Sequence, residues 1–115
     1  MYLNTEHAVE QFGDVEALVP MLTMLEESLS RDVGQIAELL GAGDAPAANR
    51  LLHPMKGFLP LFCNEELCAE LGDVEMLSKK GSAAEVAPAY AALQPKLEHL
   101  LVEVSDFLKS NDVSS

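Results

Sequence analysis

Apolar residues recur along most of the chain three or four positions apart, which is the spacing of amphipathic α-helices. Two long stripes follow Asp14 and Ser82. Between them lie two shorter stripes, one from Asp44 to about Phe62 and one that begins after Asn64. Runs of β-branched residues, which would favour strands, are missing. The pattern therefore predicts an all-α protein.

Each predicted helix begins beside a residue that favours a helix N-terminus. The side chains of Asn, Asp, Ser and Thr accept hydrogen bonds from the free backbone N–H groups of a first turn. Glu85, three residues after Ser82, would complete a capping box there. A short first helix through Gln11 would end at Gly13. The expected N-caps are Asn4 or Thr5, Asp14, Asp44, Asn64 and Ser82.

Four substantial helices joined by loops of a few residues predict an antiparallel up-down four-helix bundle, with the short first helix as an N-terminal addition. At 115 residues the chain is expected to be a single domain, 1–115. The core bundle should span about 14–108, and the polar tail 109–115 is expected to be frayed.

The third predicted helix carries a histidine on its polar side. At 100° per residue, His53 lies opposite the apolar stripe, with Gly57 one turn further on and Lys56 at its flank. This arrangement presents an imidazole to a large partner instead of burying it. The apolar face comprises Ala48, Leu51, Leu52, Met55, Leu59 and Phe62.

Further residues of this helix are candidates for contact with a partner. Arg50 and Pro60 lie on the same outer side as His53, and Leu61 is expected to lie partly outward beside them. We expect docking on the exposed side of this helix and on the adjacent face of the long helix that precedes it.

The charge of the chain excludes several kinds of partner. With 19 acidic and 7 basic side chains, the net charge is −12, so we expect no binding to nucleic acid or to an anionic membrane. No apolar run approaches the roughly 20 residues of a membrane span, and no signal peptide is visible. A cytoplasmic protein with a protein partner is therefore expected.

Other reactive side chains give weaker signals. On one helix, Cys63 and Cys68 would point roughly 140° apart, which favours two ordinary buried thiols over a disulfide or metal site. His7 and His99 join no motif and are expected to be structural or surface residues. The methionines expected to fill the core are Met21, Met24, Met55 and Met76.

The segment His53-Pro54-Met55-Lys56-Gly57 resembles the His-x-Leu-Lys-Gly motif of the histidine phosphotransfer (HPt) domains of bacterial two-component phosphorelays. That family is built on a four-helix bundle, and the resemblance covers roughly Asp14 to Leu108. Other positions typical of the family are matched by Gly43-Asp44, Phe62, Leu67 and Val74-Glu75.

The resemblance implies that His53 accepts a phosphoryl group, that Lys56 helps to neutralise it, and that Gly57 leaves room for the partner's active site. The implied partners are receiver domains of response regulators or of a hybrid sensor kinase, which would bring the aspartate and Mg²⁺. No cofactor or metal is expected on this chain. No ATP-binding or autokinase motif is present, so we expect a monomeric phosphocarrier and not an enzyme.

Two prolines leave an alternative open. Pro54 directly follows His53, and Pro60 comes six residues later. A proline within a helix removes a hydrogen bond and costs about 3 kcal/mol. If these prolines turned the imidazole inward, the chain would be an HPt-like bundle that only binds a kinase or regulator.

Overall fold

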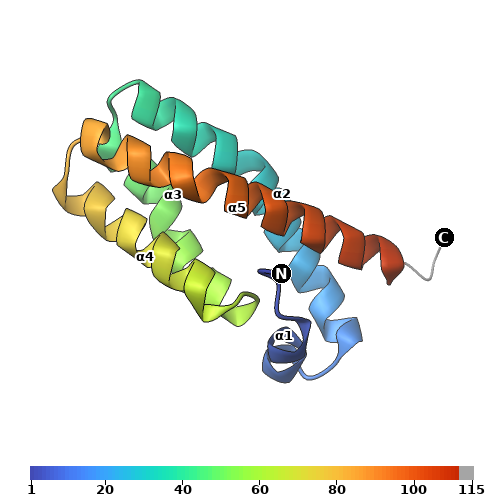
Figure 1. Ribbon diagram of the computed structural model, residues 1–115. Coiled ribbons are helices and arrows are strands. Elements are labelled where there is room, and N and C mark those ends of the chain that lie inside the picture. Colours follow the sequence, from blue (N-terminus) through green and yellow to red (C-terminus); the bar gives the residue numbers. More distant parts are fainter. Residues whose placement is uncertain (112–115) are drawn as a thin grey trace.

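The computed structural model describes residues 1–111, which form packed helices and the short segments that connect them (Figure 1). The all-α prediction is confirmed. Within this range the chain forms five α-helices and one 3₁₀ turn: α1 (Thr5–Phe12), α2 (Val15–Gly41), α3 (Ala45–Phe58), η1 (Leu59–Leu61), α4 (Glu65–Lys80) and α5 (Ala83–Ser110).

Helices α2 to α5 form the predicted up-down bundle. The long helices α2 and α5 run antiparallel, α3 packs against α2 and α4, and α4 packs against α5, which closes the ring. In Figure 1, α2 and α5 extend beyond the shorter pair α3 and α4. Helix α1 packs against α2 near the end that the shorter pair leaves uncovered.

The helix starts follow from local side-chain chemistry. In each case the capping side chain accepts a hydrogen bond from the backbone N–H three residues further on, as the sequence predicts. At the start of α5, Glu85 also accepts from the backbone N–H of Ser82, so the capping box is complete. The observed N-caps are Asn4, Asp14, Asp44, Asn64 and Ser82.

The core lies between the four bundle helices and is almost entirely apolar. Leu52 of α3, Leu71 of α4 and Leu97 of α5 are fully buried. Tyr90 is also buried, and its hydroxyl donates a 2.6 Å hydrogen bond to the Val33 carbonyl of α2. The apolar face predicted for the third helix is buried, except that Leu51 is only half-buried.

The third helix ends earlier than predicted, at Phe58 instead of about Phe62. Pro60 has no N–H to donate to the Lys56 carbonyl, so α-helical hydrogen bonding cannot continue there. The backbone tightens into η1, and the N–H groups of Phe62 and Cys63 both donate to the Leu59 carbonyl at 2.9 Å.

The segment before α1 fixes this turn from outside. The Asn4 N–H donates to the Phe62 carbonyl and the Asn64 N–H donates to the Tyr2 carbonyl, in a short antiparallel bridge. The N–H groups of Tyr2 and Leu3 donate to Glu103 Oε1 on α5 at 2.9 and 3.1 Å. The chain that follows η1 is thereby tied through residues 2–4 to α5, while η1 itself contacts α1 and α4.

The structure differs from the sequence prediction in two further details. Helix α5 continues through Ser110, so Lys109 and Ser110 of the predicted tail are helical, and residues 112–115 lie outside the described range. Met24 and Met76 are 60% and 42% exposed, because they lie at the borders of their apolar stripes and not in the core. None of the helices in residues 1–111 is long and apolar enough to cross a lipid bilayer.

Candidate functional site

His53 lies on the outward face of α3, with 63% of its side chain exposed. Pro54 does not turn it inward, because α3 remains helical from Ala45 to Phe58. The carbonyl that Pro54 leaves without a helical partner belongs to Arg50, an exposed residue where water can replace the lost donor.

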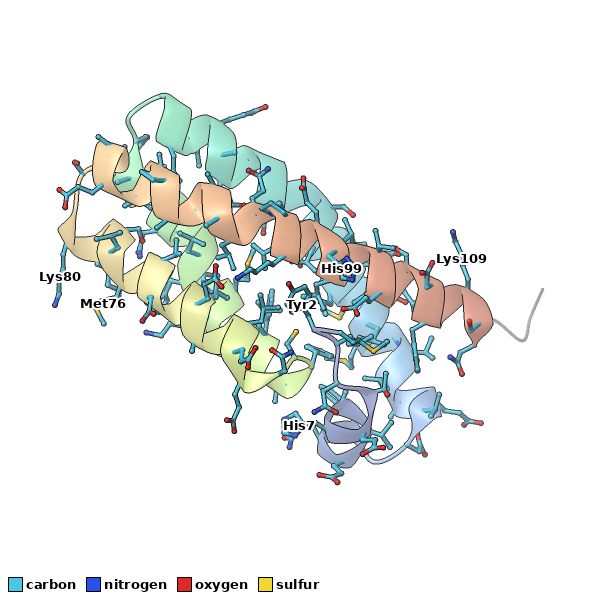
Figure 2. The ribbon with its side chains drawn as sticks, viewed as in Figure 1. Tyr2, His7, Met76, Lys80, His99 and Lys109 are labelled. Carbon is cyan, nitrogen blue, oxygen red and sulfur yellow. The ribbon has the colours of Figure 1, made fainter. Side chains whose placement is uncertain are left out.

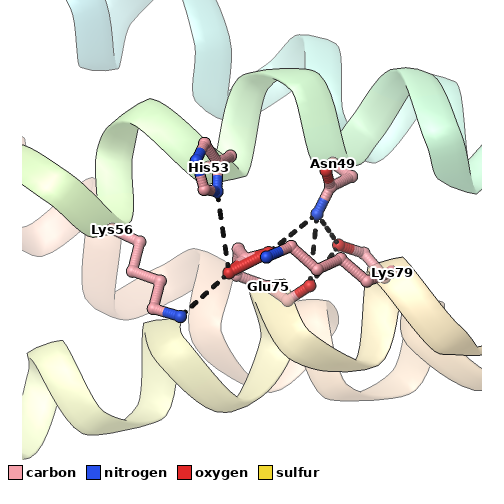
Figure 3. A network of polar contacts seen from close by, with 6 residues as sticks. Asn49, His53, Lys56, Glu75 and Lys79 are labelled. Carbon is pink, nitrogen blue, oxygen red and sulfur yellow. Dashed lines mark hydrogen bonds and ion pairs between the residues drawn. The ribbon is translucent and has the colours of Figure 1, made fainter.

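A buried carboxylate from α4 lies beneath the imidazole (Figure 3). Glu75 Oε1 is 3.9 Å from His53 Nδ1, while the Glu75 side chain itself has no exposed surface. Burying an unpaired carboxylate would be costly, so the partners of Glu75 decide whether this arrangement is stable.

The two oxygens of Glu75 have different partners. Lys56 Nζ donates to Oε1 at 3.0 Å, on the side of His53. Asn49 Nδ2 donates to Oε2 at 2.9 Å, and Lys79 Nζ lies 3.4 Å from the same oxygen. Figure 3 shows the donors converging on Glu75 from α3 and from α4 itself. The carboxylate thus links the two helices and fixes the position of Lys56 next to His53.

Asn49 strengthens the same link. Its Nδ2 also donates to Ser78 Oγ at 2.9 Å, and that hydroxyl donates to the Glu75 carbonyl at 2.6 Å. Within the described residues, every buried side-chain nitrogen and oxygen has a hydrogen-bond partner. A fully satisfied polar network of this kind holds its members in one geometry.

The network keeps Glu75 ionised. Burial acts to raise the pKa of the carboxyl group, but the hydrogen bonds from Lys56, Asn49 and Lys79 outweigh it and hold the pKa below its ordinary value of 4.5. Two lysines therefore share one carboxylate, which leaves one excess positive charge beside His53 in a chain whose net charge is −12.

The other predicted site residues lie on the same outer surface. Gly57 is exposed, and a Cβ placed there would meet no atom of the chain within 4 Å, so the space above it is open. Arg50 is exposed and forms no ion pair with any residue in 1–111. Pro60 is exposed and Leu61 half-buried in η1, beyond the end of α3. Of the residues that the sequence predicts for the site besides His53, only Lys56 belongs to the Glu75 network.

Leu61 instead lines an apolar groove between α2 and the α3–η1 segment. The groove has a volume of about 130 Å³, and it includes the exposed Met24. It is formed by one side of α2 and by residues at and beyond the end of α3. Its lining residues are Met21, Met24, Leu25, Ser28, Phe58, Leu61 and Phe62.

The remaining histidines are in different surroundings, as Figure 2 shows. His7 Nε2 lies 3.0 Å from the Pro60 carbonyl, so this side chain helps α1 to hold η1. His99 is on α5, 62% exposed and 3.8 Å from Glu103 Oε2, and it meets the Tyr2 ring edge-on. In residues 1–111 no lysine pairs with the groups that these two imidazoles face, whereas Lys56 pairs with the same Glu75 oxygen as His53.

The two cysteines are free thiols in the structure. Cys63 is buried, whereas Cys68 is half-buried and its Sγ donates to the Cys63 carbonyl at 3.9 Å. Burial raises the pKa of both thiols, which keeps them protonated at neutral pH. In residues 1–111 no group of three or more His, Cys, Asp or Glu side chains is arranged to hold a metal ion.

Sequence reasoning missed most of the network around His53. The sequence indicates Glu75 only as a position matched in the HPt resemblance, and it indicates no role in the site for Asn49, Ser78 or Lys79. The available signals were Asn49 four residues before His53 and Lys79 four residues after Glu75, each one helical turn away. Neither signal indicates that the two helices meet at these residues.

Comparison with known proteins found no matching family model, no matching curated protein and no matching solved structure. The interpretation of the site therefore depends on its own geometry and on the sequence motif.

We predict that Glu75→Gln lowers the free energy of unfolding by about 1–3 kcal/mol at pH 7, because two lysines lose their carboxylate. The pKa of Glu75 is lower in the folded protein than the ordinary value of 4.5. Its contribution to stability is therefore present above pH 4.5 and is lost as the pH falls through the pKa of the folded protein. Urea unfolding of both proteins from pH 7 to pH 3 should show a difference that shrinks below about 4.5.

Glu98→Gln is the matched control, because Glu98 is exposed on α5 and its replacement removes the same charge. Its effect should stay within about 0.5 kcal/mol at every pH. A Glu75→Gln deficit that does not change with pH would contradict the assignment of Glu75 as an ionised carboxylate.

Proposed function

We propose that this chain is a histidine-containing phosphotransfer protein that relays a phosphoryl group through His53, to or from the aspartate of a receiver domain. The observation that carries the proposal is the exposed imidazole of His53 beside Lys56, above the buried and ionised Glu75. The His-x-x-Lys-Gly motif on a helix of a four-helix bundle supports it.

The geometry supports Nε2 of His53 as the reacting atom. Nδ1 faces Glu75 Oε1, and a negative carboxylate favours the tautomer that carries its proton on Nδ1. The lone pair of Nε2 is then free for attack on phosphorus. A P–N bond forms, the P–O bond to the receiver's aspartate breaks, and its electron pair leaves with the carboxylate. The Nδ1 proton stays in place, and the reverse step returns the phosphoryl group.

Phosphoryl transfer requires an in-line approach and neutralisation of charge on the phosphoryl oxygens, and little further chemistry from the protein. Lys56 supplies a cation that Glu75 holds beside His53. The open space over Gly57 admits the partner's active-site loops. The receiver would supply its aspartate and Mg²⁺, so this chain acts as a phosphocarrier and not as an enzyme.

The apolar groove beside η1 suits the docking of a receiver domain. Met24 is exposed there and Leu61 lines it, and Pro60 of η1 and Arg50 of α3 are exposed as well. Apolar contacts surrounded by polar residues are typical of protein interfaces. We place the protein in the cytoplasm as a monomer, between receiver domains or between a hybrid sensor kinase and a response regulator.

A bundle that only binds a kinase or regulator is the second candidate. Pro54, which directly follows His53, favours it, because it replaces a helix-forming residue at the point of closest approach to a partner. The two candidates differ in whether His53 ever carries phosphate.

We predict that His53→Gln abolishes labelling of the protein by phosphorylated receiver domains, because it removes the one histidine in residues 1–111 whose carboxylate partner also pairs with lysines. The measurement is transfer of radioactive phosphate from a panel of receivers, with an acid-labile and alkali-stable product expected. His99→Gln is the matched control, since His99 has a similar exposure of 62% and a carboxylate at 3.8 Å. It should be labelled like the wild type.

Binding of a receiver without any transfer to the wild type would favour the binding-only bundle. Label that persists in His53→Gln would show that another residue accepts the phosphoryl group.

We also predict that Met24→Gln weakens the affinity for the receiver that labels the protein by about tenfold, because a side chain in the apolar groove becomes polar. The dissociation constant can be measured by calorimetry. Met76→Gln is the control, because Met76 is also exposed but lies on α4, and it should change the affinity less than twofold. Equal effects of the two variants would remove the groove from the docking surface.

A further inference from the structure

Lys79 has a position that mirrors that of Lys56. Both are paired with Glu75, Lys56 with Oε1 and Lys79 with Oε2, and they come from different helices. Their side chains are similarly exposed, at 41% and 42%. The phosphotransfer function proposed above uses Lys56 and gives Lys79 no task.

We propose that Lys79 is a second phosphoryl-binding residue. When His53 is phosphorylated, the ammonium group of Lys79 moves away from Glu75 Oε2 and pairs with the phosphoryl group. This inference rests on the proposed function and extends it to a residue of α4 outside the His-x-x-Lys-Gly motif.

The charges of the site show why a second cation is needed. A phosphoryl group adds a charge of about −2 within reach of a carboxylate that is already ionised. Lys56 alone would leave an excess of negative charge there, in a chain that carries −12 overall. With Lys79 present, the excess of negative charge at the site is smaller by one unit. Partial burial strengthens the interactions between charges there.

The contacts also show why Lys79 is able to move. At 3.4 Å, Lys79 is further from the Glu75 carboxylate than Lys56 at 3.0 Å and Asn49 at 2.9 Å. Oε2 retains the hydrogen bond from Asn49 when the lysine leaves. The four-carbon stem of Lys79 is flexible and its side chain is 42% exposed, so its ammonium group can exchange one anionic partner for another. Glu75 keeps its bonds from Asn49 and Lys56, which Figure 3 shows, while its second lysine exchanges partners.

A purely structural role for Lys79 predicts something different. Lys79 is four residues after Glu75 on α4 and lies in its last turn, where a cation favours the helix C-terminus. In that case its removal would change the stability of the unphosphorylated protein and not the distribution of the phosphoryl group.

The sequence offers a matched pair of variants. Lys79→Met and Lys80→Met remove the same charge from adjacent positions in the last turn of α4, but of these two lysines only Lys79 forms an ion pair within residues 1–111. Methionine keeps an unbranched chain and favours helix, so both variants should fold. Lys79→Arg restores the charge.

The experiment measures how the phosphoryl group distributes at equilibrium between the protein and a receiver domain that labels the wild type. We expect Lys79→Met to shift this equilibrium toward the receiver by about fivefold, Lys80→Met by less than twofold, and Lys79→Arg to recover most of the wild-type value. Urea unfolding of the unphosphorylated variants, measured in parallel, reports any structural effect separately.

Equal shifts for Lys79→Met and Lys80→Met would overturn the inference while leaving the phosphotransfer function intact. A loss of stability in Lys79→Met without a shift in the equilibrium would overturn it in favour of the structural role. Failure of every receiver to label the wild type would instead overturn the proposed function, and this inference with it.

Discussion

The buried carboxylate of Glu75 is the interaction on which the site depends. A carboxylate with no exposed surface is stable only if charged or polar donors surround it, and here they come from two helices. Asn49 and Lys56 of α3 and Lys79 of α4 meet this requirement together, so the register between the helices and the ionisation of the carboxylate support each other. His53 lies above this network, with Nδ1 directed at the fixed negative charge of Glu75 and Nε2 available to a partner.

The link between α3 and α4 through Glu75 lies apart from the apolar core, which is the main source of the protein's stability. The long helices α2 and α5 pack against each other along the core, and each supports one helix of the shorter pair. Residues on the outer side of α3 therefore need not contribute to the core. This freedom explains how α3 tolerates Pro54 and how η1 can expose Pro60 and Leu61 on its outer side. An exposed imidazole costs the fold little and is the form in which a large partner can reach it.

Much of the fold follows from the sequence because its determinants are local. Each N-cap involves residues three apart, and each buried face repeats every three or four residues, so both are visible along the chain. The end of α3 at Phe58 was mispredicted because the effect of Pro60 on the preceding turn competes with an apolar stripe that continues to Phe62. Met24 and Met76 lie at the borders of their apolar stripes. Whether a residue at such a border is exposed depends on how far the neighbouring helices cover it.

The candidate site could be predicted only in part, for the same reason. His53 and Lys56 are one helical turn apart and are recognisable together, whereas Glu75 is one of 19 acidic residues in the sequence. Its role appears only when α3 and α4 pack and bring Asn49 within 2.9 Å of it.

The most direct test of this account is the identity of the phosphorylated atom. The protein, labelled with ¹⁵N in its histidines, would be treated with phosphoramidate, a small phosphoryl donor, and examined by NMR. We expect coupling between phosphorus and Nε2 of His53 alone, while Nδ1 keeps its proton facing Glu75. Phosphorylation of His7 or His99, or of Nδ1 of His53, would contradict the central role given to the Glu75 network.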